Sequence, residues 1–412
     1  MPHLNRTQKS LIAVHILRMV LELFTSTFLT SHIVSLTPDN MLGDGLFNVG
    51  LFYISQFSVY AVFYLLVSHF VDKSNRIGFL RFGIVIYVFL LIAIVFWGEQ
   101  LSKWIVLAGS LIGFSDAFYY SSYLVMKNEL TNRKNIKNYN IHTTILTNIT
   151  KIIVPTILGF LIDVSSYSNI AIYVIILSVI EFAISFMIKS QKPENSSFEL
   201  KEYFSYLKQN KDIRKKIKYT YFNAALVGPK STYKIIVVVL TIYTFKTNLS
   251  LGLLTSIFSI ITMLLLMLYK KFDGRKNLKQ TPIYLSIGIL PVVACVIMVI
   301  WLNKTTLIIY NAFLTIAIYF SEYFGSTERD AIIKNVGKYE YIAEHQFIVE
   351  TVQDISRIIS YGLFVIVGLI SSITAFKVLL LILILINPVK YLVMNKQRKI
   401  RKEFEKQAES AA

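Results

Sequence analysis

The sequence predicts an all-α integral membrane protein in which twelve transmembrane helices form two pseudo-symmetric six-helix bundles. Of its 412 residues, 55% are hydrophobic and only 16% are charged, whereas a soluble protein carries about a quarter charged residues. Apolar runs of about 20 residues recur along the chain, and each is long enough to cross about 30 Å of hydrocarbon. Two short charged segments also repeat at a single offset, which indicates that one bundle was duplicated.

The apolar runs give the twelve predicted spans and the domain boundaries. The spans are residues 10–36, 46–70, 78–98, 101–126, 140–163, 168–188, 217–244, 248–269, 281–302, 305–327, 343–369 and 373–394. A long polar segment separates the sixth span from the seventh. We therefore expect an N-terminal bundle at 1–190, a cytoplasmic linker at 191–216, a C-terminal bundle at 217–394 and a basic cytoplasmic tail at 395–412.

The distribution of basic residues predicts the orientation. Most of them lie in alternate connections and in the tail, whereas the opposite connections hold only Lys103, Lys246 and Lys304. The positive-inside rule then places both termini in the cytoplasm, and we expect the protein in the plasma membrane. In the linker, Leu200, Tyr203, Phe204 and Leu207 follow helical spacing beside several lysines. This pattern predicts either an amphipathic helix on anionic membrane lipid or a solvated linker helix.

Composition also excludes several classes of function. The net charge of +18 accompanies no nucleic-acid-binding motif, so we expect no nucleic acid as a partner. The single cysteine, Cys295, cannot form a disulfide within the chain. The six histidines show no metal-ligand spacing, and no glycine-rich phosphate loop is present. We therefore expect no metal, no cofactor and no enzyme activity, and we expect transport by a monomer to draw its energy from an ion gradient.

The repeat places charge inside the predicted membrane. Residues 114–118 (FSDAF) return as 320–324 (FSEYF), and residues 148–153 (NITKII) return as 354–359 (DISRII). The acids Asp116 and Glu322 are thus equivalent, as are the bases Lys151 and Arg357. The helical rise of about 1.5 Å per residue puts each acid and base near the midplane. Ionisable groups at that depth are costly, so they indicate a functional site.

Other charges share these spans, and three interpretations remain open. The candidates for binding substrate or protons are Arg18, Glu22, Asp116, Lys151, Lys230, Lys234, Glu322, Glu350, Asp354 and Arg357. They form a substrate site or proton relay, or they are buried ion pairs that fix helix packing, or some lie nearer the surface than the predicted register implies. Asp116 and Glu322 are the first candidates for proton carriers. The second half carries two additional acids, Glu350 and Asp354, so we expect proton handling there first.

The loop between the second and third spans adds a family resemblance. Asp72, Lys73 and Arg76 occupy it, and Asp273 and Arg275 occupy the corresponding loop of the second half. With twelve spans, a 6+6 division and a half-to-half repeat, the chain resembles the major facilitator superfamily. That loop signature matches in its acidic and basic positions but lacks both glycines. The resemblance implies that these five residues form a cytoplasmic gate, that the substrate site lies between the halves, and that the third and sixth helices of each half face lipid. Glu181, on the sixth span, would then be peripheral.

These observations predict a secondary active transporter that works by alternating access. The basic residues inside the spans favour a small polar, zwitterionic or amphipathic substrate with an anionic or carbonyl portion. A proton is favoured over sodium as the coupling ion, and export is favoured over import. A lipid or glycolipid flippase on the same fold is the alternative, and a non-transporting membrane receptor or scaffold is the alternative from another class.

Overall fold

The computed structural model is built of helices, and the predicted all-α membrane fold is confirmed. It describes residues 4–71, 75–130, 136–189, 199–273, 280–336 and 341–411, and no strand occurs among these residues. Helix starts follow local capping chemistry. Asn5 and Gln8 form a capping box before the first helix, in which each backbone N–H donates to the other side chain at 2.8 and 3.0 Å. Such caps satisfy backbone groups that have no partner inside the helix.

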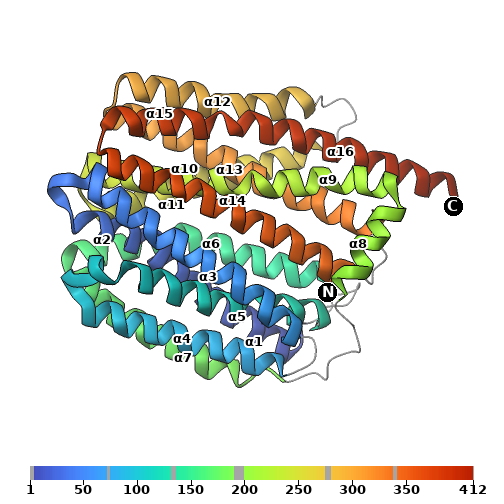
Figure 1. The fold of residues 1–412 in the computed structure, drawn as a ribbon, viewed down its shortest axis with the longest axis horizontal. Coiled ribbons are helices and arrows are strands. Elements are labelled where there is room, and N and C mark those ends of the chain that lie inside the picture. The colour runs from blue at the N-terminus through green and yellow to red at the C-terminus, as the bar shows by residue number, and fades with distance from the viewer. Residues whose placement is uncertain are drawn as a thin grey trace. The chain divides into compact units, whose positions relative to one another are not determined.

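The first half of the chain contains seven α-helices, which are drawn in blue to green in Figure 1. They are α1 (Arg6–Leu23), α2 (Thr30–Ser35), α3 (Leu46–Val71), α4 (Arg76–Trp97), α5 (Ile105–Leu130), α6 (Ile136–Val164) and α7 (Tyr167–Ser185). A π-helical segment, Phe24–Leu29, joins α1 to α2 within one continuous rod. Such segments are rare in proteins, and those that do occur often lie at functional sites.

The second half contains nine α-helices, because two of its six predicted spans are interrupted and the linker adds a helix of its own. They are α8 (Leu200–Gln209), α9 (Lys211–Ala225), α10 (Val227–Phe245), α11 (Asn248–Asp273), α12 (Gln280–Ile300), α13 (Lys304–Val336), α14 (Ile342–Ile370), α15 (Ile373–Ile384) and α16 (Ile386–Ala411). The last predicted span is therefore α15 followed by the start of α16.

Ten stretches of the described residues are long and apolar enough to cross a membrane. One of them, Arg76–Lys127, contains both α4 and α5, and the apolar part of α12, Leu285–Ile300, is shorter than the others. Each of the twelve predicted spans therefore corresponds to a helical segment of the structure.

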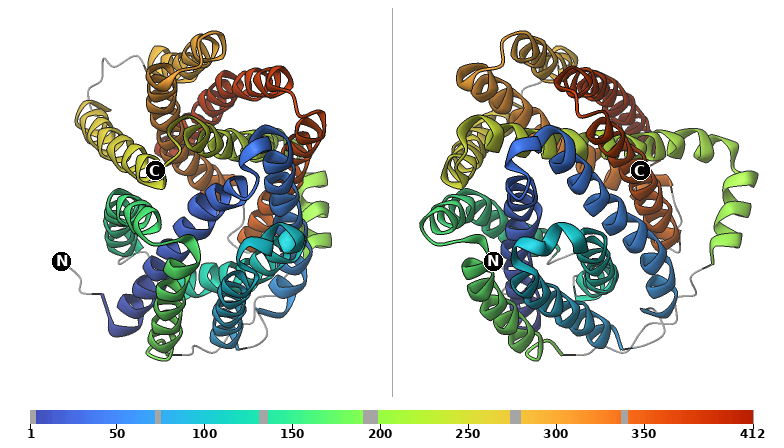
Figure 2. Two further views of the ribbon diagram at one scale, coloured as in Figure 1. Left: turned by 90° about the vertical axis from the view of Figure 1, so that its left-hand side faces the viewer. Right: turned by 60° about the vertical axis from the view of Figure 1, so that its left-hand side comes forward.

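The chain divides into two compact units. Unit 1 contains residues 1–196, 237–260 and 361–373, and unit 2 contains residues 197–236, 261–360 and 374–412. In unit 1, α5 packs against α3 and α4, and α7 packs against α1 and α4. In unit 2, α12, α13 and α16 pack against one another, as the gold-to-red helices of Figure 2 show.

Within unit 1, α6 and the start of α11 are packed closely enough to require glycine. A Cβ atom on Gly159 would lie 2.4 Å from the carbonyl oxygen of Asn248, and one on Gly252 would lie 2.2 Å from that of Pro155. The carboxylate of Asp163 accepts hydrogen bonds from the backbone N–H groups of Asn248 and Leu249 at 2.9 and 2.7 Å. Asp163 thus caps the N-terminus of α11, where a negative charge is favourable.

The amphipathic linker helix is present, and its apolar face is covered by protein. In unit 2, Tyr203 and Leu207 of α8 are buried in a cluster with Ile217 of α9 and Ile400 of α16. Phe204 is exposed. The sequence predicted that the apolar face of this helix lies on lipid or belongs to a solvated linker helix. In the structure, other helices of unit 2 cover most of that face.

Candidate functional site

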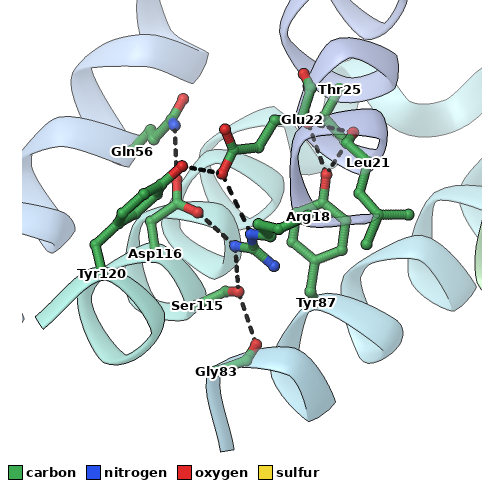
Figure 3. A network of polar contacts seen from close by, with 10 residues as sticks. All are labelled: Arg18, Leu21, Glu22, Thr25, Gln56, Gly83, Tyr87, Ser115, Asp116 and Tyr120. Atoms are coloured by element: carbon green, nitrogen blue, oxygen red, sulfur yellow. Dashed lines mark hydrogen bonds and ion pairs between the residues drawn. The ribbon is translucent and has the colours of Figure 1, made fainter. Parts of the chain in front are cut away.

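Arg18 of α1 lies at the centre of a polar network inside unit 1 (Figure 3). Its side chain is fully buried, and its Nη2 atom donates to Asp116 Oδ1 at 2.5 Å and to Ser115 Oγ at 2.9 Å. Its Nε atom donates to Glu22 Oε1 at 3.3 Å. Glu22 follows Arg18 by four residues, so both side chains project from one face of α1. Arg18 is therefore paired with one acid from its own helix and one from α5.

Aromatic and backbone groups hold the guanidinium in place. Its carbon lies 4.1 Å from the ring centroid of Tyr87 and 4.9 Å from that of Tyr119. Ser115 extends the hydrogen-bond network to α4, because its hydroxyl donates to the carbonyl oxygen of Gly83 at 2.8 Å. Tyr87 and Thr25 share a hydrogen bond of 2.7 Å directly beside the π-helical segment. Cation–π contacts and a satisfied network restrict the position of a buried arginine.

The two acids have further donors. Tyr120 donates to Glu22 Oε1 at 2.5 Å, and Gln56 of α3 donates to Asp116 Oδ2 at 3.3 Å. Neither Tyr120 nor Gln56 was among the residues predicted from sequence. Tyr120 follows Asp116 by four residues on α5, so the FSDAFYY motif could have indicated that both face the same space.

A third carboxylate lies near Arg18, and it corrects a prediction. Glu181 of α7 was expected on a lipid-facing helix, but it is fully buried, because α7 packs against α1. Both of its carboxyl oxygens lack a hydrogen-bond partner among the described residues, and so does Nη1 of Arg18. Arg18 and Glu181 are close enough to interact electrostatically. We call Arg18, Glu22, Asp116 and Glu181 the Arg18 cluster.

The Arg18 cluster carries more acids than its cation can neutralise. One guanidinium faces three carboxylates, and Arg18 remains protonated in a protein. A single unpaired charge deep in a membrane costs at least about 2.5 kcal/mol. If all three acids were ionised, the cluster would hold two excess negative charges. At least one of these acids is therefore expected to hold a proton.

A second cluster lies in unit 2 and has the opposite excess. Lys230 and Lys234, one turn apart on α10, both donate to the same oxygen of Glu322 on α13, at 2.7 and 3.0 Å. Lys230 is buried, whereas the side chains of Lys234 and Glu322 are 44% and 39% exposed. Lys390 of α16 is buried and interacts electrostatically with all three. We call these four residues the Lys390 cluster.

Lys390 was missed by the sequence analysis, although a signal was available. It lies inside the last predicted span, 373–394, and a charge at such a position is itself the signal. The position of α16 is fixed on both sides of Lys390. Asn387 donates to the carbonyl oxygen of Gly288 on α12 at 3.0 Å, and Tyr391 donates to that of Ala317 on α13 at 2.7 Å.

The acids predicted to handle protons in the second half form a local set on α14. Asp354 is buried and accepts from Arg357 Nη1 at 2.7 Å, three residues along the same helix. Glu350 is half-buried and accepts from Gln346 at 2.8 Å. The interpretation that the fourth-span acids pair with the fifth-span bases Lys151 and Arg357 stays a prediction. In each half the fourth-span acid, Asp116 or Glu322, pairs with a base on the first span.

The remaining predicted site residues belong to neither of the two clusters. Lys151 is half-buried on α6, near His15, which stacks on Tyr123 with 4.2 Å between ring centroids. Of the predicted gate, Arg76 is buried at the start of α4. Asp72, Lys73 and Arg275 lie outside the described residues, as does the side chain of Asp273. Among the described residues, no group of three or more His, Cys, Asp or Glu is arranged to hold a metal ion.

These features define a multi-span membrane protein with two charge clusters in its helix bundles. The sequence profile of the Major Facilitator Superfamily matches residues 19–360. The chain therefore belongs to this superfamily, and it is a transporter of the secondary type. A comparison with curated protein sequences finds no match.

Solved structures share the fold. A bacterial homologue of the iron transporter ferroportin, in an inward-facing state, aligns with a TM-score of 0.72 at 12% identity over 95% of this chain and 98% of its own. A bacterial homologue of the human lysosomal transporter Spinster gives 0.61 at 11% identity over 97% of both chains. A bacterial metal transporter gives 0.63 at 11% identity over 96% of this chain and 99% of its own. At such low identity these likenesses extend to the fold alone.

Proposed function

We propose that this protein is a proton-coupled secondary active transporter of a small solute and works by alternating access. The observation that carries the coupling is the Arg18 cluster, in which one guanidinium faces three carboxylates inside the bundle. A gradient-driven carrier needs a group that gains and loses a proton while its partners change. Asp116 and Glu22 meet this need, because both already share Arg18.

The geometry supports an exchange of partners around Arg18. When Asp116 takes a proton, its attraction for the guanidinium falls and its Gln56 contact can persist. Glu181 can then accept a hydrogen bond from Nη1 of Arg18. In the described structure, neither Nη1 nor either carboxyl oxygen of Glu181 has a hydrogen-bond partner. The neighbouring π-helical segment allows local rearrangement of α1. In this proposal Arg18 moves between Asp116 and Glu181 as the proton enters and leaves.

This proposal moves proton handling from the second half to the first. The sequence favoured the second half because of Glu350 and Asp354. In the structure, Asp354 is matched by Arg357, and Glu322 is the only carboxylate among the described residues of the Lys390 cluster. A proton on Glu322 would remove the carboxylate charge that Lys230 and Lys234 share. Glu322 is therefore a poorer proton carrier than Asp116.

A titration of the purified protein tests this proposal without a known substrate. The probe is the infrared absorption of protonated carboxyl groups, followed over a pH series. Asp116→Asn, Glu22→Gln and Glu181→Gln should each remove part of the titrating signal, whereas Glu99→Gln, at an exposed position, should leave it unchanged. If the three variants titrate like the parent protein, the Arg18 cluster does not carry the proton.

Transport is then measured in proteoliposomes with an imposed pH gradient, with inorganic phosphate and succinate as probes. Asp116→Asn should abolish the dependence on the gradient, and full gradient-driven transport by this variant would contradict the proposal. We favour export, cytoplasmic termini, a plasma-membrane location and a monomer. Movement of labelled lipid between leaflets in the same vesicles would instead support a flippase, and absence of any transport would support a receptor or scaffold.

A further inference from the structure

The Lys390 cluster brings three lysines together around one carboxylate. Lys230 and Lys234 converge on a single oxygen of Glu322 at 2.7 and 3.0 Å. One carboxylate can offset one of these ammonium groups. Lys390 adds a third, and among the described residues it takes part in no hydrogen bond or ion pair. The described cluster therefore holds two positive charges in excess.

The position of Lys390 is fixed by burial and by contacts of the residues on either side of it. Its residue is only 5% exposed, and a fully buried lysine is rare without a partner. The flanking contacts of Asn387 with α12 and of Tyr391 with α13 fix how far α16 is rotated at this point. A group held in position before its partner arrives loses less entropy on binding.

The four residues lie inside the predicted membrane. From the predicted outer ends of their spans, the rise of about 1.5 Å per residue places Lys234, Lys230, Lys390 and Glu322 between about 15 and 26 Å along the helix axes. All four residues belong to unit 2 and lie on α10, α13 and α16. The side chains of Lys234 and Glu322 are 44% and 39% exposed, so the described protein does not cover one side of the cluster.

We propose that Lys230, Lys234 and Lys390 form a binding site for an anionic oxygen group, a carboxylate or a phosphate, for which the carboxylate of Glu322 is the competing internal ligand. Ammonium groups recognise such oxygens through charge-assisted hydrogen bonds. An anion that enters from the exposed side displaces Glu322 from one lysine and meets Lys390, which has no other partner. The inference rests on the proposed transport function for its purpose, since it assigns the substrate an anionic portion.

The test is equilibrium binding without any gradient, so its result is independent of proton coupling. Purified full-length protein in neutral detergent is titrated with inorganic phosphate and with succinate at constant ionic strength, and thermal unfolding reports occupancy. We expect at least one probe to stabilise the parent protein. Lys390→Gln should weaken that binding about tenfold or more, whereas Lys399→Gln, an exposed lysine on the same helix, should not.

Two variants guard against misfolding as an explanation. Lys390→Arg keeps the charge and should retain binding. Lys390→Met removes a charge that has no partner, so it should raise the unfolding temperature of the anion-free protein while abolishing the response to anions. A lower unfolding temperature for Lys390→Met would show that Lys390 has a structural partner and would overturn the proposal. So would equal binding by Lys390→Gln and the parent protein, or no response of the parent to any probe.

A lipid arm identifies the source of the anion. The parent protein and Lys390→Gln are compared in phosphatidylcholine nanodiscs with and without phosphatidylglycerol. Stabilisation by phosphatidylglycerol that Lys390→Gln removes assigns the site to a lipid headgroup, whereas stabilisation by soluble phosphate or succinate alone assigns it to a solute. If anions bind but the infrared titration of the Arg18 cluster fails, the anion site stands and only proton coupling is lost.

Discussion

The Arg18 cluster and the Lys390 cluster occupy corresponding helices of the two halves, yet their excess charges have opposite sign. In both, a base on the first span pairs with the acid that the repeat places on the fourth, Asp116 or Glu322. Glu22 and Glu181 surround the first pair with acid, whereas Lys234 and Lys390 surround the second with base. Each repeated acid thus has a base from the first span of its own half as partner, and the remaining neighbours carry charges of opposite sign in the two clusters.

Burial also separates the two clusters. Arg18 is fully buried among aromatic rings, while Glu322 and Lys234 are each more than a third exposed. Solvent screens an exposed ion pair and leaves it weak, whereas removing one partner of a buried pair leaves a costly charge. The same type of substitution should therefore have unequal effects in the two halves.

The largest effect is expected for Arg18→Gln. It removes the buried cation that pairs with Asp116 and Glu22 and lies near the buried Glu181, so we expect the free energy of unfolding to fall by about 3–5 kcal/mol and transport to be lost. Thermal or denaturant unfolding in detergent measures the first and proteoliposome transport the second. Adding Asp116→Asn should recover part of the lost stability. A double variant no more stable than Arg18→Gln would contradict the pairing.

A smaller effect of a different kind is expected for Glu322→Gln. Loss of the shared acceptor should lower stability by about 1–2 kcal/mol, since solvent screens part of the repulsion among the lysines. Added phosphate or succinate should restore that stability and bind more tightly than to the parent protein, because the internal competitor is gone. Anions should not rescue Arg18→Gln. Equal rescue of both variants would remove the distinction between the clusters.

The smallest effect is expected for Glu181→Gln. If Glu181 is the acid that holds the proton at rest, glutamine keeps its charge state, and stability at neutral pH should change by less than about 1 kcal/mol. If Glu181 is instead an ionised partner of Arg18, the substitution should cost about 3 kcal/mol or more. Denaturant unfolding separates these outcomes, with Glu99→Gln as the exposed control.

Much of the fold could be predicted from sequence because membrane helices are local. Every backbone group in a helix bonds within its own segment, so an apolar run of sufficient length determines the helix by itself. The interruption after Leu226 and the break between α15 and α16 at Leu385 were not predicted. Nothing in the apolar pattern marks them, because both lie inside otherwise continuous runs.

The site was predicted only in part, for a related reason. The repeat located Asp116 and Glu322, and depth arithmetic placed them near the midplane. Depth, however, does not state which way a side chain points. It indicated that Lys151 and Arg357 lie at a similar depth, whereas it gave no sign of the ion pairs that the helix packing forms with Arg18 and Lys230.

By itself the sequence determined the membrane class, the twelve segments, the duplicated acids and the excess of charge inside the spans, because each of these follows from local composition and spacing. Only the tertiary structure decided which charges meet. Glu181 joins the Arg18 cluster because α7 packs on α1, and Lys390 joins Lys230 and Glu322 because α16 is held against α12 and α13. Both residues lie far along the chain from the partners they reach. Contacts of that kind depend on how helices rotate and pack, which one-dimensional periodicity does not record.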